Sequence, residues 1–322
     1  MLADPYQHMR QFFWRAFAAL ALLASVNRLI PAGPVQAAEA AVSISHLTAI
    51  LSDGGSSSRE SRRRAIAAIP LKGMSAADRQ TVDRCLRSTT LYRRLPAETV
   101  ICDQDLLEFA VRKPEAIVDI WRTLGISRLA LDKVAPGQWR LSDGFGTVGA
   151  LRLLQHERRG AGCALVLHGR GAYSGPLSPT ELTGTCLLLV QCSAAEPTVD
   201  GRTRQTVQID AFVDMDGIGL EIVTRTLQPL IVRSAAANVH EICLFMASLS
   251  KSAAENPSGV VHLTTRLNRT DPADRRELAA IARAAAVDGR HRPDDPAAGQ
   301  RLQTEIASRW LPAEELDRLQ SR

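Results

Sequence analysis

Hydrophobic and polar residues alternate across six consecutive segments between residues 128 and 213, and this pattern constrains the fold more than any other feature of the sequence. Alternation at every second position is typical of strands that bury one face. Turn residues such as Pro136-Gly137 and Arg159-Gly160 separate the segments. Sequential strands joined in this way favour an antiparallel meander over a parallel sheet. The predicted strands are Arg128–Lys133, Gln138–Leu141, Thr147–Gln155, Cys163–His168, Gly184–Cys192 and Gln205–Val213.

The hydrophobic period becomes helical on both sides of these strands. Residues 103–109 and 114–124 predict two helices before them, and Pro114 suits a first helical position. Residues 218–254 predict a long helix after them, either kinked at Pro229 or split into two abutting helices. Its stripe consists of Val239, Ile242, Cys243, Met246 and Leu249. We expect this stripe to pack on the sheet, against Leu151, Leu153, Leu165, Leu167, Leu188 and Val190.

The order of helix, antiparallel strands and long helix resembles the START and polyketide-cyclase-like superfamily over residues 103–260. The resemblance implies an α+β fold, a helix-grip in which a β-meander curls around a long C-terminal helix, with small helical additions at both ends. It also implies a cavity between sheet and helix, because most members of that superfamily bind hydrophobic ligands and a minority catalyse reactions on them. A different α+β sandwich with a filled core is the alternative.

Five segments resemble landmarks of an uncharacterised family of exported bacterial proteins. The similarity extends over about residues 75–265 and implies domain limits, but no activity. The segments are L-Y-R-R-L-P (91–96), I-C-D-Q-D-L (101–106), D-I-W-R-T-L-G-I (119–126), D-G-F-G-T (143–147) and T-L-Q-P-L (226–230).

Residues 1–37 predict an export signal. Arg10 and Arg15 precede a short apolar run over residues 16–26, and residues 35–37, Val-Gln-Ala, form a small-residue cleavage site. An uncleaved membrane anchor is the alternative, whereas a cleaved signal leaves no stable membrane span. The remaining chain then divides into a helical N-terminal region (38–102), the α+β core (103–260) and a helical, partly disordered tail (261–322).

Export would place the six cysteines where disulfides can form, although six buried thiols remain the alternative. Cys85 and Cys102 flank the end of a predicted helix and the following segment, which makes them the best candidate pair. Cys186 and Cys192 lie on one predicted strand, about 20 Å apart, which is too far to bond.

Several motifs fail on inspection. Gly144 to Gly149 fits G-x-G-x-x-G, but a strand rather than a helix follows it, so a tight turn is predicted instead of a nucleotide site. Asp210, Asp214 and Asp216 do not fit the calcium loop of an EF-hand. The seven histidines lack metal-ligand spacing, and a net charge of +5 gives no argument for nucleic acid. We therefore expect no metal, cofactor or nucleic-acid partner.

The candidate ligand-binding residues are aromatic or polar side chains expected at the open end of the cavity, where an apolar body with a hydrogen-bonding tip suits a ligand. They are Trp121, Trp139, Tyr173 and His168. Three functional hypotheses remain: an exported protein that binds an apolar small molecule or lipid, a structural or interaction protein of the cell envelope with a filled core, and an enzyme acting on a bound ligand. A pocket would distinguish the first two, and a titratable group with a shifted pKa would favour the third.

Overall fold

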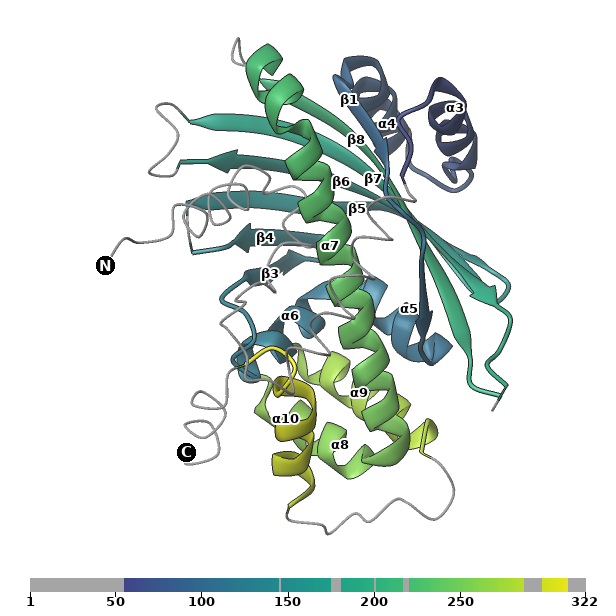
Figure 1. The fold of residues 1–322 in the computed structure, drawn as a ribbon, viewed down its shortest axis with the longest axis vertical. Coiled ribbons are helices and arrows are strands. Elements are labelled where there is room, and N and C mark those ends of the chain that lie inside the picture. The colour runs from purple at the N-terminus through teal and green to yellow at the C-terminus, as the bar shows by residue number, and fades with distance from the viewer. Residues whose placement is uncertain are drawn as a thin grey trace.

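The chain folds as an α+β protein in which one long helix crosses an antiparallel sheet (Figure 1). The computed structural model describes residues 55–144, 146–174, 181–199, 201–216, 220–286 and 297–311. The strands are Leu91–Arg94 (β1), Glu98–Ile101 (β2), Ala130–Ala135 (β3), Gln138–Ser142 (β4), Thr147–Arg159 (β5), Gly162–Tyr173 (β6), Leu182–Ala195 (β7) and Arg204–Asp216 (β8). The helices are Arg59–Ala68 (α3), Ala76–Ser88 (α4), Gln104–Arg112 (α5), Pro114–Thr123 (α6), Leu220–Glu255 (α7), Pro257–Arg266 (α8), Pro272–Ala284 (α9) and Ala298–Ala307 (α10).

The eight strands form one sheet with the order β1-β8-β7-β6-β5-β4-β3. Strand β1 pairs with residues 210–213 of β8, and β2 pairs with residues 204–207 of the same strand. All the paired strands described are antiparallel. The six predicted strands correspond to β3 through β8, which follow one another across the sheet. The predicted meander is therefore confirmed, and the fold class with it.

Alternation along the strands divides the interior into two clusters on opposite faces of the sheet. Leu165 and Leu188 belong to the larger cluster, which lies beneath α7 and is called here the α7-side core. Their neighbours Val166 and Leu187 belong to the smaller cluster, which packs against α3 and α4 and is called the α4-side core. The six sheet residues predicted to face the long helix all lie in or against the α7-side core.

The long helix α7 is a single element that continues through Pro229, which settles the choice between one helix and two. Proline removes one helical hydrogen bond, yet the element is not divided at this point. Val239, Met246 and Leu249 are buried in the α7-side core, and Ile242 packs against it. The predicted stripe is confirmed as part of the core that α7 shares with the sheet. Figure 1 shows the helix running across the strands.

The N-terminal region differs from its prediction as a purely helical segment. Its helices α3 and α4 each begin at a serine cap, since Ser58 Oγ accepts from the Ser61 N–H and Ser75 Oγ from the Asp78 N–H. The segment also contains β1 and β2, which extend the sheet along β8. Strands of four residues carry too little alternation to be recognised locally, and their pairing is decided by the distant strand β8.

The predicted tail is also part of the main body. Helix α8 spans the expected boundary at residue 260. Leu263, Leu278 and Leu302, from α8, α9 and α10, are buried in the α7-side core. The three helices gather around the C-terminal half of α7 (Figure 1). The segment predicted as an export signal, residues 1–37, lies outside the described residues, as do residues 287–296 and 312–322 of the predicted tail.

The predicted Cys85–Cys102 disulfide is wrong. All six cysteines are described, and each is a buried thiol rather than half of a disulfide. Cys85 lies in the α4-side core and Cys102 in the α7-side core. Because the sheet separates the two clusters, residues that are close in sequence cannot bond across it.

Candidate functional site

Three of the four predicted ligand-binding residues lie on the α7 side of the sheet. Trp121 (α6) and Trp139 (β4) are buried in the α7-side core. Tyr173 ends β6 and is buried, and alternation from Leu165 and Leu167 places it on the same face. His168 follows Leu167 directly and therefore points to the opposite face. Its expected place beside the two tryptophans is wrong, because one position along a strand reverses the side chain.

Trp139 is held by a buried carboxylate rather than presented to a cavity mouth. Its Nε1 donates to Glu115 Oε2 at 2.6 Å, between β4 and α6. Burial raises the pKa of Glu115, although the bond from Trp139 and the charge of Lys133 oppose this shift. Lys133 Nζ lies 3.7 Å from Glu115 Oε1. The pair ties α6 to β4 of the sheet.

Lys133 extends this contact into an ion-pair network with α9. Its Nζ lies 2.6 Å from Asp271 Oδ2 and 3.3 Å from Asp274 Oδ2. Lys113 Nζ lies 2.6 Å from the other oxygen of Asp274. Burial tends to raise the pKa of Asp274, but the two lysines outweigh it and the pKa is lowered. The network pairs two lysines with three carboxylates and links β3, α6 and α9, which fits a structural role.

Trp121 sits where α6 meets α7, and its polar atom has no partner. Its ring meets Phe245 edge-on, with centroids 5.7 Å apart, and Phe245 in turn meets Trp310. The side chain is 2% exposed, yet Nε1 makes no hydrogen bond within the described part of the chain. A buried N–H left unpaired costs about 1–3 kcal/mol, so such a group calls for an explanation, and a bound partner is one.

Tyr173 shows the same combination at the far end of β6. It stands opposite Thr147 of β5 and Leu182 of β7. The residue is 3% exposed, and its hydroxyl has no hydrogen-bond partner among the described residues. Two of the predicted positions therefore carry buried, unsatisfied polar tips on the α7 side.

A further polar pair lies between β2 and α7. His240 Nδ1 is 3.2 Å from Glu98 Oε2, and both side chains are buried. Glu98 pairs in register with Val207 of β8, a member of the α7-side core. The pair thus anchors α7 to the edge of the sheet.

His168 belongs to a basic environment on the α4 side. It stands opposite Arg152 of β5 and Leu187 of β7. Burial lowers the pKa of His168, and the charges of Arg152, Arg84 and Arg170 lower it further. The imidazole is therefore held neutral, on the face that α4 covers.

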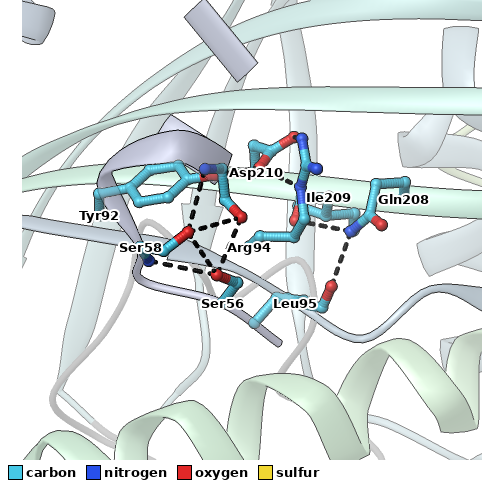
Figure 2. Close-up of polar contacts among 9 residues, drawn as sticks. Ser56, Ser58, Tyr92, Arg94, Leu95, Gln208, Ile209 and Asp210 are labelled. Carbon is cyan, nitrogen blue, oxygen red and sulfur yellow. Dashed lines mark hydrogen bonds and ion pairs between the residues drawn. The ribbon is translucent and has the colours of Figure 1, made fainter. Parts of the chain in front are cut away.

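The opposite face also contains a compact charged cluster, shown in Figure 2. Asp210 is fully buried, and its Oδ1 accepts from the Tyr92 hydroxyl at 2.7 Å and from Arg94 Nε at 2.9 Å. Arg94 Nη2 donates to Oδ2 at 3.0 Å, which completes a two-pronged ion pair. Burial raises the pKa of Tyr92, and the hydrogen bond to Asp210 raises it further. The cluster fastens β1 to β8.

Serine hydroxyls at the start of α3 adjoin this cluster (Figure 2). Ser56 exchanges two backbone hydrogen bonds with Arg94, of 3.0 and 2.8 Å. The hydroxyls of Ser56, Ser58 and Ser61 bond to one another in a ring at 2.9–3.1 Å. The contact joins the N-terminal helices to the edge strand β1.

The landmark segments fall at structural joints of this kind. L-Y-R-R-L-P contains Tyr92 and Arg94, and Asp103 of I-C-D-Q-D-L caps α5 through the Leu106 N–H. Asp119 Oδ2 accepts from the N–H groups of Arg269 and Thr270 and from the Thr270 hydroxyl. These contacts account for polar residues of three segments without a ligand.

The structure describes most of the residues of two motifs that the sequence rules out. Gly144 and Gly146 have positive φ values of 72° and 105° in the turn between β4 and β5, as a tight turn requires. Asp210 and Asp214 lie within β8 rather than in a loop. The described residues contain no group of three or more metal-ligating side chains, nor a helix long and apolar enough to cross a membrane.

Sequence reasoning missed the buried polar pairs. Asp210 was considered only as part of a calcium loop, yet it shares a strand face with Phe212. A carboxylate at an apolar position of an alternating strand signals a buried cation partner. The partners themselves, Tyr92 and Arg94, lie 118 and 116 residues away, and no local pattern identifies them.

Comparison with known proteins leaves the function open. No protein-family model and no curated protein match the chain. An uncharacterised protein from Rhizobium leguminosarum is 13% identical, with 47% of this chain and 95% of that one covered and a TM-score of 0.26. The Mll3558 protein from Rhizobium loti is 23% identical, with 46% and 97% covered and a TM-score of 0.26. At these values neither similarity supports an argument about function.

Proposed function

We propose that the protein binds a small, largely apolar molecule between α7 and the sheet, with hydrogen bonds from Trp121 and Tyr173 to polar groups of the ligand. The observation that carries this proposal is that two of the predicted residues, Trp121 and Tyr173, are among the buried side chains whose polar atoms have no hydrogen-bond partner in the described residues. Trp Nε1 is a donor only, whereas a tyrosine hydroxyl can donate or accept. A lipid or polyketide-like molecule with a carbonyl, carboxylate or hydroxyl group has the chemistry to satisfy both.

A second candidate function, that of a structural or interaction protein with a filled core, is favoured by the density of the α7-side core. Phe245, Met246 and Leu249 of α7 are buried in the same cluster as Leu165 and Leu188 of the sheet. Direct packing of this kind needs no ligand between these side chains. The ligand is therefore proposed beside them, where Trp121 and Tyr173 carry polar atoms without partners in the described residues.

Binding is tested first by native mass spectrometry of the purified protein after mild extraction. The proposal expects a small molecule that co-purifies in a fixed ratio. Titration with the fluorescent fatty acid cis-parinaric acid then tests the named residues. A Tyr173→Phe substitution removes one hydrogen bond of about 1 kcal/mol, and the affinity should fall by about fivefold.

Tyr92→Phe is the matched control, because it removes the same hydroxyl from the opposite face of the sheet. This variant should lose stability but keep the affinity of the natural protein for the probe. Absence of saturable binding together with no co-purified molecule would favour the filled-core function. Equal loss of affinity in both variants would contradict the assigned position of the ligand.

We also propose that the protein acts outside the cytoplasm, after export and removal of residues 1–37. The support is the sequence pattern of Arg10, Arg15, the apolar run 16–26 and the small residues at 35–37. In a periplasmic or secreted setting, the ligand would come from the envelope or the surrounding medium.

A further inference from the structure

Two cysteines of the α7-side core face each other across neighbouring strands. Cys163 of β6 stands directly opposite Cys192 of β7 in the antiparallel ladder. Both are buried, at 5% and 6% exposure. A Cβ on the adjacent Gly162 would lie only 2.2 Å from the Cys192 carbonyl oxygen, so the glycine permits the close approach of the strands at this point.

The spacing of directly opposed residues suits a disulfide. Their Cα atoms lie about 4.5 or 5.5 Å apart, depending on the hydrogen-bonding pattern of the pair, and a disulfide spans about 4.4–6.8 Å. Bond formation would therefore need a change of side-chain rotamers rather than a shift of the strands. The other direct partners of these two residues along the sheet are Arg158 and Val207, which cannot form such a bond.

The surroundings of the pair favour a reactive thiolate. The Cys192 thiol hydrogen-bonds to Cys163 and lowers its pKa, and His156 of β5 lowers it further. Burial and the charge of Glu108 from α5 oppose the shift. Correspondingly, hydrogen bonding to Cys163 and burial raise the pKa of Cys192. One thiol is thus suited to attack and its neighbour keeps a proton until a second step.

The pair lies near an end of the ladder, where small reagents gain access by fraying. Cys163 is the second residue of β6, directly after the exposed turn at Gly160-Ala161. On β7, the exposed residues Ser193 and Ala194 follow Cys192. Opening of a few terminal hydrogen bonds costs far less than unfolding of the sheet.

We propose that Cys163 and Cys192 are a redox-active dithiol that closes a disulfide between β6 and β7 by exchange with a small-molecule disulfide. The Cys163 thiolate attacks one sulfur of the oxidant and forms a mixed disulfide. The other half of the oxidant leaves as a thiolate and takes up a proton. Cys192 then loses its proton to solvent and attacks the Cys163 sulfur, and the second thiolate leaves. The oxidant is reduced to two thiols, and the protein loses two hydrogen atoms.

The full chain is tested as purified protein that has been reduced, freed of reductant and incubated with oxidised glutathione under native conditions. Exchange is then stopped, the protein is unfolded, and its free thiols are counted. The count should be four in place of six. Peptide mapping should find one internal link, between the peptides containing Cys163 and Cys192. The thermal midpoint of the oxidised protein should exceed that of the reduced protein, because the bond constrains the unfolded chain.

Two serine variants separate the steps. Cys192→Ser should stop at the glutathione adduct on Cys163, whereas Cys163→Ser should react far more slowly. Cys186→Ser is the matched control, since it removes another buried thiol of the same core and should still close the disulfide. The proposal is overturned if the natural protein keeps all six thiols, or if the link joins any other pair, and neither result depends on a variant that folds.

Discussion

At the scale of single residues, charges buried in this protein are stable only because each has a specific partner. Asp210 is the extreme case, since its side chain is fully buried and engages Tyr92 and Arg94 together. Removal of one partner from such a group leaves an uncompensated charge, which costs more than the pair itself contributes.

We predict that Asp210→Ala lowers the free energy of unfolding by about 3–5 kcal/mol, because it leaves a guanidinium and a phenol hydroxyl without their acceptor. Urea unfolding followed by circular dichroism measures the change. Asp132→Ala is the matched control. Its pair with Arg269 has a similar distance of 2.8 Å but side chains 43–51% exposed, so the loss should stay below about 1 kcal/mol. Comparable losses in the two variants would contradict the importance of burial.

At the scale of elements, α7 and the sheet define the fold together. The stripe on α7 shares one core with residues from both halves of the meander, and the edge strands β1 and β2 are added where β8 would otherwise be open. An unpaired edge invites association with other chains, so the two short strands also protect β8.

Met246→Asp should unfold the protein or destabilise it by several kcal/mol, because the new carboxylate would be buried among apolar side chains without a cation. Thermal unfolding and the dispersion of amide signals in a nuclear magnetic resonance spectrum measure the effect. Lys251→Asp introduces the same side chain at an exposed position of the same helix, where the ion pairs to Glu255 and Glu305 are weak. The free energy of unfolding of this control should lie within about 1 kcal/mol of that of the natural protein. A folded Met246→Asp variant would contradict the packing of α7 on the sheet.

At the scale of the whole molecule, the N-terminal and C-terminal additions are integral parts of the body. Helices α3 and α4 cover one face of the sheet, while α8, α9 and α10 extend the core around α7 (Figure 1). Cleavage after residue 37 would leave every described residue in the chain.

Export makes a definite prediction about the N-terminus of the mature chain. Protein recovered from the producing cells should begin at Ala38 or within two residues of it, because signal peptidase requires small residues at positions such as Val35 and Ala37. N-terminal sequencing checks this. Ala37→Leu should block or displace the cleavage and leave a longer chain. Protein that starts at Met1 in a soluble cytosolic fraction would rule out export.

The sequence by itself determined the elements whose signal is local. Alternation identified β3 through β8, and the helical stripe from Val239 to Leu249 identified the buried face of α7. Hydrophobic period and capping are properties of residues a few positions apart, so they can be recognised without knowledge of the fold. Even the sheet residues facing α7 followed, since alternation assigns a face once one residue is placed.

Only the tertiary structure decided which distant groups meet. It added β1 and β2 to β8 and gave Asp210 its partners. It placed His168 on the opposite face from Trp139. It also separated Cys85 from Cys102 and set Cys163 opposite Cys192. These outcomes depend on strand order and register, where a single position reverses a side chain. Buried polar groups such as Trp121 Nε1 and the Tyr173 hydroxyl become visible only when the surrounding packing is known, because burial is a property of the whole fold.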